Sequence, residues 1–164
     1  MSDIDLDLGD TRLILAHCKR YDLLRNQAAY VLATAFWETA RTMEPVSEAF
    51  WVTDAEAWRK RNLRYYPHYG RGYVQLTWEG NYRFAGKQLD VDLLTYPHLA
   101  LKPEYAARIL VEGCRDGWFT RKDLANGWTS GHRLEDFITL QQSNFVDARR
   151  IVNGTDKADT IAAI

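Results

Sequence analysis

Acidic side chains and a polar, glycine-containing segment lie close together in the first half of the sequence. Glu38 is followed shortly by Glu48, and the segment 70–77 then brings two glycines, Gln75 and Thr77. Enzymes that cut glycosidic bonds use two carboxyl groups in unlike environments, one to donate a proton and one to act on water or the sugar. These residue types at this spacing therefore indicate glycosidic bond hydrolysis.

Glu38 is the first candidate for the proton donor. Its neighbours Phe36, Trp37 and Ala40 are apolar, and they lie on a segment with the apolar spacing of a core helix, about 26–42. A carboxylic acid pressed against apolar groups keeps its proton more readily, because burial disfavours the charged form. A general acid needs that property. The alternative is a surface glutamate on an amphipathic helix.

Two residues compete for the role of general base, Glu44 and Glu48. Glu44 precedes Pro45 near the predicted helix end, where its side chain would point to another face than Glu38. Glu48 lies in the predicted loop 43–53 and is free to face Glu38 across a water molecule. We prefer Glu48 and keep Glu44 open.

The segment Tyr73–Trp78 alternates like a β-strand, which would place Gln75 and Thr77 on one face. These side chains would orient sugar hydroxyls and the attacking water, or they are simply the solvated face of the strand. Asn81 follows at the start of the next predicted helix, where Asn is also common as a cap.

The remaining pattern predicts a single domain, residues 1–164, of the α+β class and mainly helical. One small antiparallel β-element is expected near 65–78, beside the cleft. Residues 1–10 are expected to be flexible, and the C-terminus is expected to be truncated or disordered. The predicted helices cover about 11–19, 26–42, 54–64, 79–89, 104–118, 134–140, 145–152 and 157–164.

Composition excludes several other classes. The net charge of −1 gives no basic footprint for nucleic acid. The four His and two Cys are scattered without metal-ligand spacing, so we expect no metal site. The sequence has no signal peptide or membrane-spanning run, which predicts synthesis in the cytoplasm as a monomer. The basic run Arg59-Lys60-Arg61 with Arg64 is either a solvated helix face or a contact with an acidic polymer such as the bacterial wall.

Three blocks give the chain a resemblance to glycoside hydrolase family 19, which contains chitinases and phage or prophage endolysins with a lysozyme-like fold. The resemblance covers about residues 26–155, and Trp37 departs from it where the family usually has His. The blocks are Phe36-Trp37-Glu38-Thr39-Ala40, Tyr69-Gly70-Arg71-Gly72-Tyr73-Val74-Gln75-Leu76-Thr77-Trp78 with Asn81-Tyr82, and Ile151-Val152-Asn153-Gly154.

The resemblance implies an inverting, cofactor-free hydrolase with Glu38 as the acid and Glu48 as the base. Thr77 is then catalytic as a water holder, and the implied substrate-binding residues are Gln75, Asn81, Tyr82 and Asn153.

The expected function is that of an endolysin that hydrolyses β-1,4 bonds of peptidoglycan. It would reach the wall after release from the cytoplasm with a holin-like partner. The alternatives are a chitinase acting on N-acetylglucosamine polymers and a non-catalytic wall-binding module.

Overall fold

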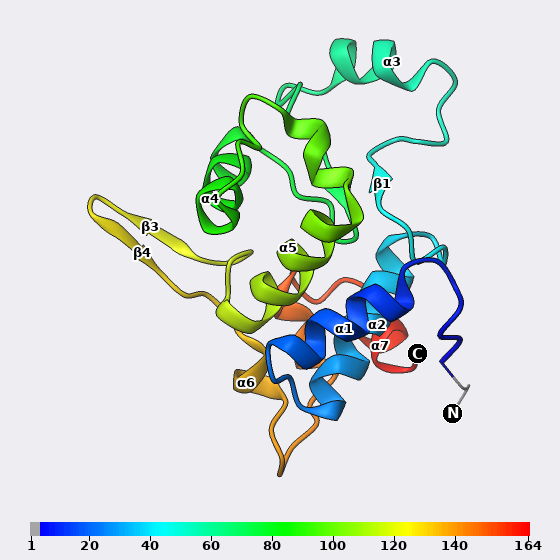
Figure 1. Cartoon of the computed structure of the whole chain (residues 1–164), viewed down its shortest axis with the longest axis vertical. Helices are drawn as coiled ribbons and strands as arrows, with labels where there is room; N and C mark the ends of the chain where they lie inside the picture. The colour runs from blue at the N-terminus through cyan, green and yellow to red at the C-terminus, as the bar shows by residue number, and fades with distance from the viewer. Residues whose placement is uncertain (1–3) are drawn as a thin grey trace.

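The computed structural model describes residues 4–164 as a mainly helical chain with two small antiparallel sheets (Figure 1). This confirms the predicted fold class. The helical elements, in chain order, are α1 (Thr11–Arg20), α2 (Arg25–Glu38), α3 (Ala55–Asn62), α4 (Glu79–Leu89), the 3-10 helix η1 (Pro97–Leu101), α5 (Pro103–Asp116), α6 (Leu134–Phe137), the 3-10 helix η2 (Asp147–Ile151) and α7 (Ala158–Ala162).

Helix α5 is central, because it contributes to both apolar clusters of the protein. Pro103 begins the helix and Gly117, at a φ of 73°, ends it in the left-handed conformation that glycine adopts without strain. Leu110 and Val111 pack in the larger cluster with α1, α2, α6, η2 and α7. Ile109 packs in the smaller cluster with α4 and η1. In Figure 1, α1, α2, α6 and α7 lie below α5, α3 lies above it, and α4 lies beside its upper part.

Helix α2 ends earlier than the sequence pattern predicted. Its last residue is Glu38, and the predicted continuation to residue 42 is wrong. Ala40, Arg41 and Met43 have positive φ values of 51°, 70° and 57°, which no α-helix accommodates. The buried Thr39 closes the helix end, since its hydroxyl donates to the Ala35 carbonyl and accepts from the Met43 amide.

The first sheet pairs β1 (Val46–Ser47) with β2 (Arg71–Gly72), so the β-element involves residues well before 65. The predicted strand Tyr73–Trp78 is wrong. Gln75 and Trp78 have φ values of 58° and 77°, and Arg71 pairs with Leu76 through two backbone hydrogen bonds. The chain therefore turns tightly between Gly72 and Leu76, and strand alternation does not apply to Gln75 and Thr77.

The second sheet, β3 (Lys122–Leu124) with β4 (Gly127–Thr129), is a hairpin that the sequence did not predict. It projects from the body of the protein beside α4 (Figure 1). Its strands are mostly exposed and carry little of the alternating apolar pattern that identifies a strand.

The start of the described chain is held by specific contacts. The Asp10 amide donates to the Met43 carbonyl at 2.8 Å, and the Asp10 carboxyl group accepts from the Tyr73 hydroxyl at 2.7 Å. The predicted flexible segment 1–10 also includes residues 1–3, which lie outside the described residues. Within residues 4–164, no helix combines the length and apolar content needed to cross a membrane.

Candidate active site

Glu38 forms an ion pair with a buried arginine. Arg149 Nη2 lies 2.7 Å from Glu38 Oε1, and the side chains of Arg149 and Glu38 are 3% and 20% exposed. A carboxylate at the last residue of a helix faces the negative end of the helix dipole. The guanidinium offsets that repulsion. Arg149 is fixed in turn, because its Nε donates to the Asp156 carbonyl at 2.9 Å. Apolar neighbours are therefore only part of the environment of Glu38.

Glu48 directly follows β1 and is held by two donors. The Tyr65 hydroxyl donates to Oε1 at 2.6 Å, and the Gly70 amide donates to Oε2 at 2.9 Å. The Glu48 amide donates to the Gly70 carbonyl at 2.7 Å, which continues the β1–β2 pairing by one residue. Burial, together with the hydrogen bond to Glu48, raises the pKa of Tyr65 to about 12, so Tyr65 remains a donor at neutral pH.

Helix α3 anchors the backbone of Glu48. Arg59 is buried, and its Nε donates to the Glu48 carbonyl at 2.6 Å. Its Nη1 lies 3.3 Å from Glu56, which also accepts hydrogen bonds from Tyr66 at 2.6 Å and Tyr69 at 3.0 Å. The hydrogen bond from Tyr66 is the largest effect that lowers the pKa of Glu56. This part of the basic run is therefore structural.

Glu44 is exposed and lies outside α2, because the helix ends at Glu38. The argument that a continuing helix turns Glu44 away from Glu38 is therefore wrong. Its amide donates to Thr42 Oγ1 at 3.2 Å, and within residues 4–164 its carboxyl group has no hydrogen-bond or ion-pair partner. Glu48, by contrast, is held by two donors, and its role as the base stays a prediction.

Gln75, Thr77 and Asn81 form one chain of hydrogen bonds. Thr77 Oγ1 donates to the Gln75 carbonyl at 2.8 Å, and Asn81 Nδ2 donates to the Thr77 carbonyl at 2.8 Å. Arg121 Nη1 then donates to Asn81 Oδ1 at 2.8 Å. Because the Thr77 hydroxyl proton is donated to the Gln75 carbonyl, the lone pairs of the hydroxyl oxygen can accept a hydrogen bond from water.

Gly70 joins this chain to Glu48. Its amide contacts the Glu48 carboxyl group, and a Cβ at Gly70 would lie 2.6 Å from Gln75 Oε1. Gln75 Nε2 donates to the Val46 carbonyl at 3.0 Å, which ties the same side chain to β1. Glu48, Gly70 and Gln75 are therefore in direct contact through a position where only glycine fits without displacing Gln75.

The other two predicted substrate contacts, Tyr82 and Asn153, do not belong to this chain of hydrogen bonds. Tyr82 is 0% exposed, and its hydroxyl accepts from Arg71 at 2.9 Å and donates to the Tyr69 carbonyl. It has no surface for a sugar, so its part in this structure is to support Arg71. Asn153 is exposed, and its amide donates to the Arg149 carbonyl at 3.0 Å, which places it next to the partner of Glu38.

Sequence reasoning missed Arg149, Tyr65 and Arg121 as members of the site. Arg149 and Arg121 reach Glu38 and Asn81 from distant parts of the chain, and no local pattern reports such contacts. The one available signal was the position of Arg149, a charged residue just before the Ile151–Gly154 block in a segment of helical apolar phase.

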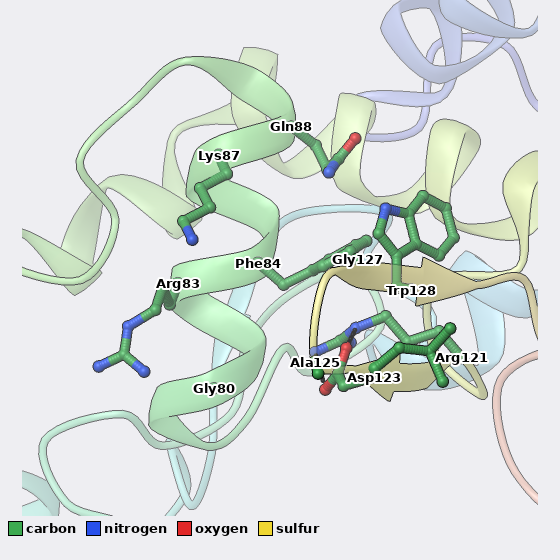
Figure 2. A pocket seen from close by; sticks show the side chains of 11 residues that line it. Gly80, Arg83, Phe84, Lys87, Gln88, Arg121, Asp123, Ala125, Gly127 and Trp128 are labelled. Carbon is green, nitrogen blue, oxygen red and sulfur yellow. Dashed lines mark hydrogen bonds and ion pairs between the residues drawn. The ribbon is translucent and has the colours of Figure 1, made fainter.

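A groove of about 430 Å³ lies between α4 and the β3–β4 hairpin, on the Arg121 side of Asn81. Figure 2 shows Phe84 and Gln88 of α4 extending toward Trp128 of the hairpin. The Phe84 and Trp128 rings meet edge to face with centroids 4.9 Å apart. Neither Glu38 nor Glu48 lines this groove. Among residues 4–164, no cluster of three or more His, Cys, Asp or Glu is placed to hold a metal.

Comparisons with known proteins identify the fold. No protein-family model and no curated protein matches the chain. Chitinase C from Streptomyces griseus HUT6037 matches with a TM-score of 0.54 and 21% identity, over 84% of this chain and 56% of that chain. A mutant of chitinase C gives a TM-score of 0.43 at 20% identity, over 84% and 72% of the two chains.

A bacterial family 19 chitinase gives a TM-score of 0.42 at 20% identity, over 96% of this chain and 88% of that chain. The match to chitinase C carries the assignment of the fold: the chain has a lysozyme-like fold, which it shares with that chitinase. It spans little more than half the length of that chitinase C chain.

Proposed function

We propose that the protein is a glycoside hydrolase of the family 19 type, which cleaves β-1,4 bonds of bacterial peptidoglycan with inversion. The observation that carries the proposal is the pair of unlike carboxyl groups. Glu38 lies beside one buried arginine, and Glu48 is held by two neutral donors and linked through Gly70 to Gln75. Unlike environments are what an acid and a base need.

In the proposed reaction Glu38 donates a proton to the oxygen of the leaving sugar. Glu48 takes a proton from a water molecule, which attacks the anomeric carbon from the opposite face. Thr77 accepts a hydrogen bond from that water, since its own proton is committed to Gln75. Arg149 orients the Glu38 carboxyl group, and Tyr65 and the Gly70 amide orient that of Glu48.

A chitinase is the second candidate, and a specific observation favours it. The structure with the highest TM-score among those compared above is that of a chitinase. Chitin and the glycan strands of peptidoglycan share β-1,4-linked N-acetylated hexosamines, so one pair of carboxyl groups serves either polymer. Peptidoglycan also carries lactyl groups and peptides.

The first experiment compares the purified protein with its Glu38→Gln variant on both polymers. We expect wild-type protein to clear permeabilised Gram-negative cells and to release little soluble oligosaccharide from chitin. Glu38→Gln preserves the size of the side chain and should lose ~10²-fold or more in rate, because general acid catalysis contributes ~10²–10⁴-fold.

Three results would redirect the proposal. Release of chitooligosaccharides without clearing would identify a chitinase. Binding to the wall without turnover would identify a wall-binding module. A folded Glu38→Gln variant with wild-type clearing would remove Glu38 from the acid role.

The proposal extends to where the enzyme acts. We propose that it is made in the cytoplasm and reaches the wall through a holin-like pore. Fractionation of cells that express it alone should leave it inside, and co-expression of a holin should bring lysis. Lysis without a holin would argue against this route.

A further inference from the structure

The basic run has a second half that the proposed active site does not use. Arg59 is buried against Glu48 and Glu56, but Lys60, Arg61 and Arg64 are exposed. Arg64 lies just after α3, and its guanidinium is 5.0 Å from the centroid of the Trp78 ring. Within residues 4–164, Arg64 has no ion-pair partner, so its charge is available to a ligand.

A short path of contacts leads from Arg64 to Glu48. Trp78 is 45% exposed, and its ring lies 4.8 Å from that of Tyr65, centroid to centroid. The Tyr65 hydroxyl donates to Glu48 Oε1 at 2.6 Å. Trp78 also directly follows Thr77 in the chain. An exposed indole and an unpaired guanidinium therefore lie one aromatic ring away from the proposed catalytic base.

Resting on the proposed function, we infer that Arg64 and Trp78 form a subsite that selects glycan strands bearing carboxylates over neutral ones. The flat apolar indole packs against the C–H face of a sugar ring. The guanidinium, kept over the indole by cation–π attraction, binds a carboxylate through paired hydrogen bonds. Chitin has no carboxylate to offer, whereas peptidoglycan has them in its stem peptides, and in its lactyl groups wherever the peptide has been removed.

Arg64 differs in its surroundings from the other exposed residues of the basic run. Arg64 is exposed and lies two residues beyond the last residue of α3, so a ligand can reach its guanidinium from the solvent side. Lys60 and Arg61 belong to the same run, but among residues 4–164 neither makes a cation–π contact with an aromatic ring. Arg61 is therefore a matched control of equal charge and similar exposure.

The experiment measures kcat/KM on three forms of peptidoglycan, with wild-type protein and the variants Arg64→Gln, Arg64→Lys and Arg61→Gln. The forms are untreated sacculi, sacculi whose carboxylates are converted to neutral amides by carbodiimide coupling with ammonia, and strands freed of peptides by an amidase. Circular dichroism checks that each variant is folded. Substitution of an exposed arginine should not affect folding.

We expect Arg64→Gln to lower kcat/KM on untreated sacculi by about three- to ten-fold, in the range of exposed and charge-assisted contacts. It should have no effect on amidated sacculi. The kcat/KM of Arg64→Lys on untreated sacculi should lie between those of wild type and Arg64→Gln, because a lysine ammonium keeps the charge but lacks the paired donors of a guanidinium. Arg61→Gln should match wild type. Amidase treatment removes the peptide carboxylates and frees the lactyl carboxylate. An effect that persists on amidase-treated strands therefore shows that the subsite accepts the lactyl carboxylate, and one that disappears assigns the carboxylate to the peptide.

Equal losses on untreated and amidated sacculi would overturn the inference, as would equal losses in Arg64→Gln and Arg61→Gln or no loss in Arg64→Gln. These results differ from failure of the proposed function, in which wild-type protein would cleave none of the three forms.

Discussion

Replacement of Arg149 by methionine tests how Glu38 is held. The substitution keeps an unbranched side chain but removes the ion pair to Glu38 at 2.7 Å and the hydrogen bond to the Asp156 carbonyl at 2.9 Å. The Arg149 side chain is 3% exposed, so in the variant the methionine side chain, and not water, occupies its place. The Glu38 side chain is 20% exposed, so after the ion pair is lost its carboxyl group is partly hydrated.

The expected cost follows from these contacts. Removing one partner of a fully buried ion pair costs about 3–5 kcal/mol. Because Glu38 stays partly hydrated and methionine retains apolar packing, we expect about 2–3 kcal/mol of lost unfolding free energy, near the ~1.5–3 kcal/mol of one charged hydrogen bond. For a chain of this size, each kcal/mol lowers Tm by about 2–4 °C, so the drop should be about 4–12 °C.

Thermal and urea unfolding of purified protein measure the cost, with clearing of permeabilised cells as the activity readout. Arg150→Met is the matched control, because Arg150 is the exposed neighbour on the same 3-10 helix and should change stability by less than ~0.5 kcal/mol. The double variant Glu38→Gln/Arg149→Met should show a coupling of at least ~1 kcal/mol.

Two outcomes would refute this reasoning. If Arg149→Met and Arg150→Met lose the same unfolding free energy, the loss in Arg149→Met does not come from removal of the buried ion pair. If the costs of the two single substitutions simply add in the double variant, Arg149 does not act through Glu38. Reduced clearing by Arg149→Met with unchanged stability would instead show that Arg149 mainly orients Glu38 and adds little to stability.

Three further substitutions test the rest of the site. Glu48→Gln should abolish clearing while Glu44→Gln should not, because only the Glu48 carboxyl group is held by donors; the reverse result would make Glu44 the base. Thr77→Val should still pull down with insoluble peptidoglycan but clear slowly, since a group acting only in the transition state affects turnover; weak binding with normal turnover would make it a substrate anchor. Gly70→Ala should displace Gln75 and slow clearing by about 10- to 100-fold, as misplaced groups do; a wild-type rate with an unchanged fold would separate Gln75 from catalysis.

The sequence predicted best those elements whose signal is local. Helix α4 begins and ends at the predicted residues, and α5 differs from its prediction by only a few residues. Pro103 and Gly117 mark the ends of α5, and apolar spacing identifies its buried face. The acidic residues were also visible in the sequence, since residue type and order along the chain suffice to identify candidates.

The sequence alone determined that the chain is mainly helical, with acidic residues near a polar, glycine-containing segment. Only the tertiary structure decided what those residues contact. The end of α2 at Glu38 depends on left-handed residues and on Thr39, and apolar spacing does not report either. The pairing of Glu38 with Arg149 joins the end of α2 to η2, far apart in the chain. Such contacts form because buried charges must find partners in the folded protein, and which partner lies within reach depends on packing.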